Sequence, residues 1–119
     1  MPVTRDQIDA LCSTFPGATL AHPPELVSWK VGGKMFACFG GDGEMNGISV
    51  KTDSIDTAAL LIDTTNAVKA PYFHASWVRL QFDATDLDEA THRLGVSYDL
   101  VRKSLKKAVR DALPPREVR

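Results

Sequence analysis

The stretch Val27-Ser-Trp-Lys-Val-Gly-Gly-Lys-Met-Phe-Ala-Cys-Phe39 decides the fold class of this chain. Its two apolar-rich halves flank Gly32-Gly33, a pair that readily supplies the two positive φ angles of a tight type I′ turn. We therefore predict an antiparallel hairpin with this pair at its tip. A regular ladder on that turn pairs residue 31 with 34, 29 with 36 and 27 with 38, and so places Trp29 opposite Phe36.

Alternation along the two strands divides their side chains between two faces of the hairpin. The inner face is predicted to carry Val27, Trp29, Val31, Phe36 and Cys38 and to be closed by Lys34. The outer face is predicted to carry Ser28, Lys30, Met35 and Ala37. We interpret Trp29 and Phe36 as core partners and not as platforms for stacking on a ligand.

Helix signals occur on both sides of the hairpin. Thr4 and Gln7 have the spacing of a capping box, and apolar residues then recur at intervals of three and four up to Phe15. Farther along the chain, Asp53 or Ser54 is a suitable N-cap for a second helix. The apolar residues of that helix are Ile55, Ala58, Ala59 and Ile62.

The last third of the chain predicts two more helices. Asp86, three residues before Glu89, marks the start of a short one, which Gly95 interrupts. Ser97 then caps the last helix, and Pro114-Pro115 ends it. Its apolar stripe is predicted to contain Tyr98, Val101, Leu105, Ala108, Val109 and Ala112.

Residues 47–51 and 77–83 alternate as strands do, with Ile48, Val50, Val78, Leu80 and Phe82 pointing inward. Gly40-Gly-Asp-Gly43 is predicted to be a loop. Helices at both ends and in the middle, with an antiparallel sheet between them, define an α+β layered fold. The 119 residues, 44% of them hydrophobic, suit a single domain, 1–119, with an ordered core at about 3–113.

If the strands share one sheet, its outer face is cationic and carries an indole. The side chains predicted there are Ser28, Lys30, Met35, Ser49, Lys51, Trp77, Arg79 and Gln81. An exposed tryptophan among cations can stack on a nucleobase or another flat ligand. The same ring could instead lie under the terminal helix or against a partner subunit.

Positive charge is concentrated at the C-terminal end. From Arg102 to Arg119, seven Lys and Arg residues face two acidic ones, a net charge of +5, whereas residues 1–101 have a net charge of −6. Such local potential attracts an anionic partner whatever the total charge. The basic residues of the predicted last helix are Arg102, Lys103, Lys106, Lys107 and Arg110.

Other classes of protein are not indicated. No apolar run approaches the roughly 20 residues that cross a bilayer, so no membrane association is expected. Cys12 and Cys38 lack metal-ligand spacing and are interpreted as reduced, buried thiols of a cytoplasmic protein, with an isolated disulfide as the alternative. We predict no metal site, no cofactor and no enzymatic activity, because no ligand cluster, nucleophile elbow or phosphate loop is present.

Four blocks in order resemble the MmcQ/YjbR-like family of small bacterial proteins. They are Trp29-Lys-Val-Gly-Gly-Lys-Met-Phe36, Ile48-Ser-Val-Lys-Thr52, Pro71-Tyr72 ahead of Trp77-Val78, and Ser97-Tyr-Asp-Leu-Val101 with Leu105-Lys-Lys107. The resemblance covers almost the whole chain. It implies a curved antiparallel sheet with helices, similar to a double-wing DNA-binding architecture.

The resulting functional expectation is a non-enzymatic protein that binds DNA weakly, mainly through phosphate contacts. The candidate residues are Lys30, Lys34, Lys51, Trp77, Arg79, Arg102, Lys103, Lys106, Lys107 and Arg110. The alternative is an interaction or adaptor module that holds an acidic or amphipathic protein and binds no nucleic acid.

Overall fold

Six antiparallel strands form one sheet, in the order β1-β2-β3-β4-β6-β5. The computed structural model describes residues 2–40 and 46–116. Its strands are β1 (Thr19–Ala21), β2 (Val27–Val31), β3 (Lys34–Gly40), β4 (Gly47–Lys51), β5 (Val68–Lys69) and β6 (Trp77–Gln81). The loop predicted after Gly40 lies outside the described residues.

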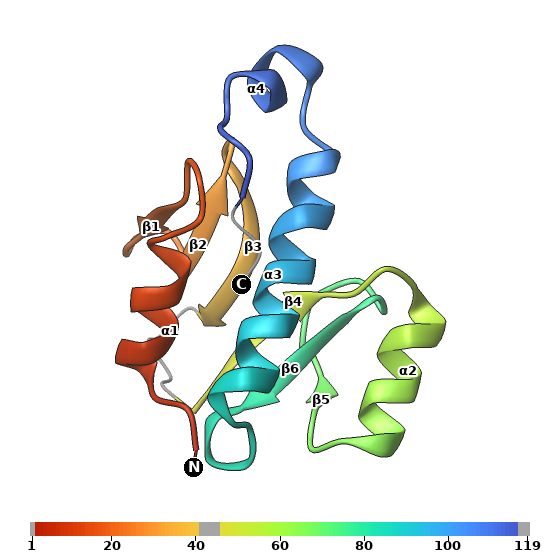
Figure 1. Ribbon diagram of the computed structural model, residues 1–119. Coiled ribbons are helices and arrows are strands. Elements are labelled where there is room, and N and C mark those ends of the chain that lie inside the picture. Colours follow the sequence, from red (N-terminus) through yellow and green to blue (C-terminus); the bar gives the residue numbers. More distant parts are fainter. Residues whose placement is uncertain (1, 41–45, 117–119) are drawn as a thin grey trace.

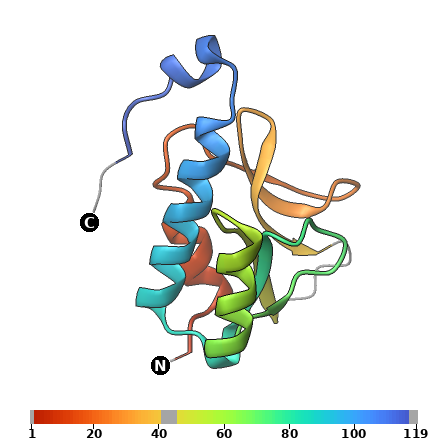
Figure 2. The same ribbon diagram turned by 90° about the vertical axis from the view of Figure 1, so that its right-hand side faces the viewer.

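The helices are α1 (Arg5–Cys12), α2 (Ile55–Thr64), α3 (Leu87–Lys103) and α4 (Lys107–Asp111), with a short 3-10 helix, η1 (Phe82–Ala84). Figures 1 and 2 show α1 and α3 side by side on one face of the curved sheet, with α2 beside the β5–β6 end. The predicted α+β fold is therefore confirmed. Within residues 2–40 and 46–116, none of the helices combines the length and apolar character needed to cross a membrane.

The glycine turn of the hairpin is confirmed. Gly32 and Gly33 have φ angles of 57° and 82°, and Val31 pairs with Lys34 as predicted. The rest of the predicted register is wrong, because β-bulges shift the pairing: Trp29 lies opposite Ala37, and Val27 lies opposite Gly40. A bulge adds a residue to one strand, which alternation alone does not reveal.

The bulges also change the two predicted faces. Cys38 pairs with Ser28 and Ser49 on the outer face, while Ala37 joins the inner core with Trp29. Phe36 stays in the core, and its ring meets that of Tyr98 edge-on at 5.4 Å between centroids. The helix-covered face is therefore the apolar one, as predicted, although individual residues differ.

The N-terminal helix begins as the sequence indicates. Thr4 and Gln7 form the reciprocal hydrogen bonds of a capping box. The helix then anchors the hairpin, because the indole N–H of Trp29 donates to Asp9 Oδ1 at 2.8 Å. Trp29 is only 6% exposed, so its predicted place in the core is confirmed.

The prediction of two helices divided at Gly95 is wrong. Asp86 is the N-cap, as expected, but α3 continues through Gly95 and Ser97 to Lys103. Gly95 is buried against the Arg116 side chain, and a Cβ there would lie 3.2 Å from a guanidinium nitrogen. A mid-helix glycine costs only about 1 kcal/mol, which tertiary packing offsets here.

Ser97 is not a cap but a buried link between α3 and the sheet. Its hydroxyl donates to Phe36 O at 2.5 Å and accepts from the Lys51 N–H at 2.9 Å. These are backbone groups of β3 and β4, whose own pairing ends at Ala37 and Val50. The Ser97 hydroxyl thus provides a hydrogen-bond partner for one backbone group of each strand at the point where β3 and β4 diverge.

The predicted last helix is also interrupted. Ser104 ends α3, and α4 begins only after Lys106. Leu105, between the two helices, is buried. Both of its methyl carbons lie within 2.8 Å of the position that a Cβ on Gly32 would take. Packing against the hairpin tip therefore bends the chain, and the single apolar stripe predicted for this region does not exist.

Candidate nucleic-acid interface

At one end of the molecule, α4 lies near the tip of the β2–β3 hairpin (Figure 1), and Val109 approaches Gly32 there. Basic residues of both elements meet at this end. The hairpin contributes Lys34, whose Nζ reaches Ser104 O at 3.5 Å. We call the group the basic end; its members are Lys34, Lys103, Lys106, Lys107 and Arg110. Lys103, Lys106 and Lys107 are exposed, and none of the described residues forms an ion pair with them.

Two of the predicted contact residues, Arg102 and Arg110, make hydrogen bonds within the protein. Arg102 donates to Leu113 O at 3.0 Å and to Pro114 O at 2.7 Å, which fixes the segment after α4. Arg110 is partly engaged, because its Nη1 donates to Lys103 O at 3.3 Å. Arg102 is therefore a structural residue, whereas Lys103, Lys106 and Lys107 form no ion pair with another residue of 2–40 or 46–116.

The outer face of the sheet has the polar character that the sequence predicts. Ser28, Cys38, Ser49, Arg79 and Val68 form one row of partners across five strands. The three small side chains of the row are buried, and Arg79 reaches over the last of them, with its Nη1 at 3.5 Å from Ser49 Oγ.

Lys51 and Trp77 lie on the same face and are paired directly across the neighbouring strands β4 and β6. Both are half-buried, and the Trp77 ring stacks on Phe73, with 4.5 Å between centroids and 27° between planes. Lys30 is less available, because its Nζ lies 2.7 Å from the Glu25 carboxylate. Lys30 accordingly lowers the pKa of Glu25 through a hydrogen bond and its charge.

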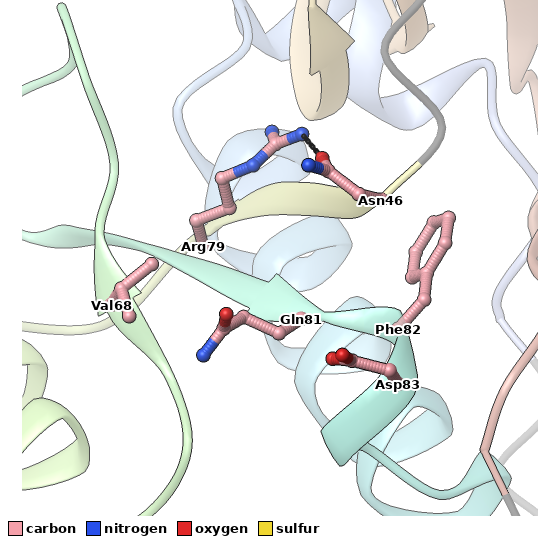
Figure 3. A pocket seen from close by; sticks show the side chains of 6 residues that line it. All are labelled: Asn46, Val68, Arg79, Gln81, Phe82 and Asp83. Carbon is pink, nitrogen blue, oxygen red and sulfur yellow. Dashed lines mark hydrogen bonds between the residues drawn. The ribbon is translucent and has the colours of Figure 1, made fainter.

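A cavity of about 450 Å³ opens beside Arg79 (Figure 3). Its walls are Asn46, Val68, Arg79, Gln81, Phe82 and Asp83. Arg79 donates from Nη2 to Phe39 O at 3.0 Å and to Asn46 Oδ1 at 3.1 Å. Gly47 makes room for this arrangement, since a Cβ there would lie 2.9 Å from Arg79 Nε.

The structure thus places eight of the ten predicted residues on two surfaces, while Arg102 is structural and Lys30 is paired with Glu25. Lys34 and the α4 region form the basic end, while Lys51, Trp77 and Arg79 lie on the outer face of the sheet. Sequence reasoning missed Phe73 and Asn46, which reach the outer face from loops. Only the aromatic character of Phe73, four residues before Trp77, is a signal in the sequence, and it does not reveal the stacking.

The remaining reactive groups are buried, Cys12 and Tyr98 in the helix-covered core and Cys38 beneath the outer face of the sheet. Cys12 and Cys38 are buried and form no disulfide, and burial raises the pKa of the Cys12 thiol far above its ordinary value. Burial likewise raises the pKa of Tyr98, whose hydroxyl donates to Pro16 O at 2.6 Å. Among the described residues, no cluster of three or more His, Cys, Asp or Glu side chains could hold a metal ion.

These features define a small α+β protein with an antiparallel sheet, helices on one face and a polar, partly cationic opposite face. The YjbR family model matches residues 13–100, and the chain therefore belongs to the YjbR family. The chain is also similar to the crystal structure of Deinococcus radiodurans protein DR2400, which has a DUF419 family domain. The two structures superpose with a TM-score of 0.81 and 23% sequence identity, and the match covers 97% of this chain and 91% of that one. This likeness confirms the fold. No curated protein matches the chain.

Proposed function

We propose that this protein binds DNA weakly and without catalysis, through phosphate contacts made by the basic end. The observation that carries the proposal is the exposure of Lys103, Lys106 and Lys107 beside Lys34, with no ion pair to them from the described residues. Lysine contacts to phosphates release counterions and are independent of base sequence. The sequence pI of about 6.3 favours modest affinity.

The outer face of the sheet provides a second contact surface in this proposal. Lys51 adds a cation, and the partly exposed Trp77 ring provides a place for an unpaired base to stack. Stacking requires a base outside a duplex, so this surface favours single-stranded or distorted DNA. Two buried cysteines without a disulfide suit a reducing compartment, and we propose that the protein is in the bacterial cytoplasm.

The proposal is tested by fluorescence anisotropy with several unrelated duplexes over a range of salt concentrations. If all five residues of the basic end contact phosphates, the slope of log K against log salt should be no steeper than about −4.5. The double variant Lys106→Glu/Lys107→Glu should weaken all duplexes alike and reduce the slope by about 2. Lys107 lies in the first turn of α4, where a glutamate is favourable, so the fold should survive.

The matched control is Lys69→Glu, which reverses an exposed charge on β5, away from the basic end. Its affinity for duplexes should remain close to that of the unmodified protein. Weakening by Lys69→Glu of about half the size, in energy, of that in the double variant would mean that only net charge matters, because it makes half the change in charge. Duplex affinity unchanged in Lys106→Glu/Lys107→Glu, with folding confirmed by circular dichroism, contradicts the proposal.

A protein-interaction module is the second candidate, and the surface of α2 favours it. Ile55, Leu60 and Ile62 are 53%, 58% and 39% exposed on this one helix. Exposed apolar side chains that gather on one element often mark a contact with another protein. If wild-type protein binds no nucleic acid at low salt, Ile55→Ser/Ile62→Ser should be compared with it in a pull-down of a defined partner.

A further inference from the structure

We propose that the cavity beside Arg79 binds a guanine base, carried either by a free mononucleotide or by a single-stranded nucleic acid. The single-strand form of this proposal rests on the proposed DNA binding, whereas the mononucleotide form does not. The cavity lies on the outer face of the sheet, and the basic end does not contribute to its lining.

The size and walls of the cavity suit a flat heterocycle. Its volume of about 450 Å³ lies within the range of about 300–1,000 Å³ found for ligand sites. Val68 and Phe82 supply apolar surface, while the polar groups come from four other side chains (Figure 3). A nucleobase has apolar faces and a polar edge, so its surface matches the apolar and polar walls of the cavity.

The donors of the cavity come from Arg79 and Asn46. The two hydrogen bonds from Arg79 Nη2 go to neutral oxygens, and within residues 2–40 and 46–116 no carboxylate lies within 4.0 Å of this guanidinium. Its charge therefore remains unneutralised by those residues. The Asn46 amide accepts from Arg79 through Oδ1, which leaves its NH₂ group to donate to a ligand.

The acceptors come from Asp83 and Gln81. The Asp83 carboxylate is exposed, and no other described side chain forms an ion pair with it. Gln81 is held in place because its Nε2 donates to Asn66 O at 2.7 Å, which leaves its Oε1 as an acceptor. The cavity thus presents donors on the Arg79 side and a two-oxygen acceptor at Asp83.

Guanine is the base whose edges match this set most completely. Its N1–H and N2 amino group are adjacent donors that one carboxylate can accept together, while O6 and N7 accept from a guanidinium or an amide. Adenine and cytosine offer an amino group without a neighbouring ring N–H, and thymine and uracil offer a single ring N–H. The Asp83 carboxylate therefore distinguishes guanine from the other bases.

The neighbouring surface suits the rest of a single strand. Trp77 and Arg79 are two residues apart on the same face of β6, which corresponds to about 7 Å along a strand. A nucleotide next to the bound guanine can therefore reach the Trp77–Phe73 stack, with Lys51 available for its phosphate. Such a strand would lie along β6.

The first experiment titrates the full chain with GMP, AMP, CMP and UMP, followed by isothermal calorimetry or NMR chemical shifts. GMP should bind at least about 5-fold more tightly than the others, the lower limit expected of a bidentate contact. Asp83→Asn should remove this preference while leaving AMP binding unchanged. Equal binding of the four nucleotides, or no saturable GMP binding, overturns the proposal.

A second variant tests the Arg79 side. Val68 is 40% exposed and pairs with Arg79 across the sheet, so Val68→Glu places a carboxylate beside the guanidinium without opening the core. GMP affinity should fall at least about 5-fold, because the carboxylate occupies the donors. Lys69→Glu is the control: it changes the net charge by more than Val68→Glu does, but residue 69 lies on the opposite face of the same strand. It should therefore leave GMP affinity unchanged. GMP binding that survives both Asp83→Asn and Val68→Glu overturns the proposal.

The two sources of the base are separated with oligothymidylate that does or does not contain one central guanine. Tighter binding of the guanine-containing strand, lost in Asp83→Asn, supports the single-strand form. Binding of GMP without this difference supports the mononucleotide form and overturns the single-strand form. Duplex binding that depends on Lys106 and Lys107 but not on Asp83, with no GMP binding, overturns the cavity proposal and leaves the proposed DNA binding standing.

Discussion

Trp29 and Trp77 lie on opposite faces of the same sheet. Trp29 is 6% exposed, belongs to the core cluster and donates its indole N–H to Asp9. Trp77 is half-buried and stacks on Phe73, a residue contributed by a loop. The helix-covered face thus uses its aromatic rings for packing, while the opposite face keeps rings and cations near solvent, and this separates the residues that hold the fold from those available for binding.

The largest effect is expected from truncation of the two tryptophans. Trp29→Ala should lower the free energy of unfolding by about 3–5 kcal/mol, because it leaves a cavity and an unpaired Asp9 contact. Trp77→Ala should cost roughly 1–2 kcal/mol, since its burial is partial. Urea denaturation followed by circular dichroism measures both. Equal losses would contradict the assignment of different roles to the two faces.

Ser97→Ala is the next largest perturbation. It leaves Phe36 O without its donor and the Lys51 N–H without its acceptor, and unsatisfied buried groups cost about 1–3 kcal/mol. Ser13→Ala, at an exposed serine that caps α1, is the matched control and should cost about 0.5–1 kcal/mol or less. If the two variants unfold at the same urea concentration, the buried link is not needed to join α3 to the sheet.

Alkaline pH should act through the helix-covered face. Burial raises the folded-state pKa of both Cys12 and Tyr98, so the unfolded chain loses these protons first and the free energy of unfolding falls as pH rises. The fall should begin near the ordinary thiol pKa of about 8.5 and reach roughly 2 kcal/mol at pH 10. Denaturation curves between pH 7 and 10 measure it. Cys12→Ala should remove most of the decline, and a decline that persists unchanged in this variant argues against the assignment.

The smallest effect on stability is expected on the outer face. Lys51→Gln should change the free energy of unfolding by no more than about 0.5 kcal/mol. Its effect should appear in the affinity for single-stranded DNA, whose slope of log K against log salt should become shallower by about 0.7. Lys69→Gln, on β5, is the control and should alter neither quantity. A large loss of stability in Lys51→Gln would show that this face also supports the fold.

Local signals in the sequence predicted much of the fold. The turn at Gly32-Gly33 and the cap at Thr4 depend on a few neighbouring residues, and both are confirmed. The bulges near Trp29 and the passage of α3 through Gly95 depend on packing between distant segments. Ser97 illustrates the limit of local signals. A serine before an apolar run is typical of a helix N-cap, but the buried Ser97 hydroxyl instead forms hydrogen bonds with backbone groups of β3 and β4.

The candidate site was predictable only in part, for a similar reason. Alternation placed Lys51, Trp77 and Arg79 on one face, and their register confirms this. The helical spacing of the C-terminal basic residues did not predict the basic end, because Leu105 turns toward the hairpin and brings Lys34 close to the α4 region. The cavity beside Arg79 could not be predicted, since Asn46, Val68 and Asp83 come together only through the fold.

The hydrogen bond from the Lys51 N–H to Ser97 has a consequence for amide exchange. Most amides in a sheet are protected by a neighbouring strand, so their exchange with solvent deuterium reports strand separation. The Lys51 amide is protected by a helix side chain instead. Its exchange rate, compared with that of the Val50 amide one residue earlier, would measure how often α3 lifts from an otherwise intact sheet.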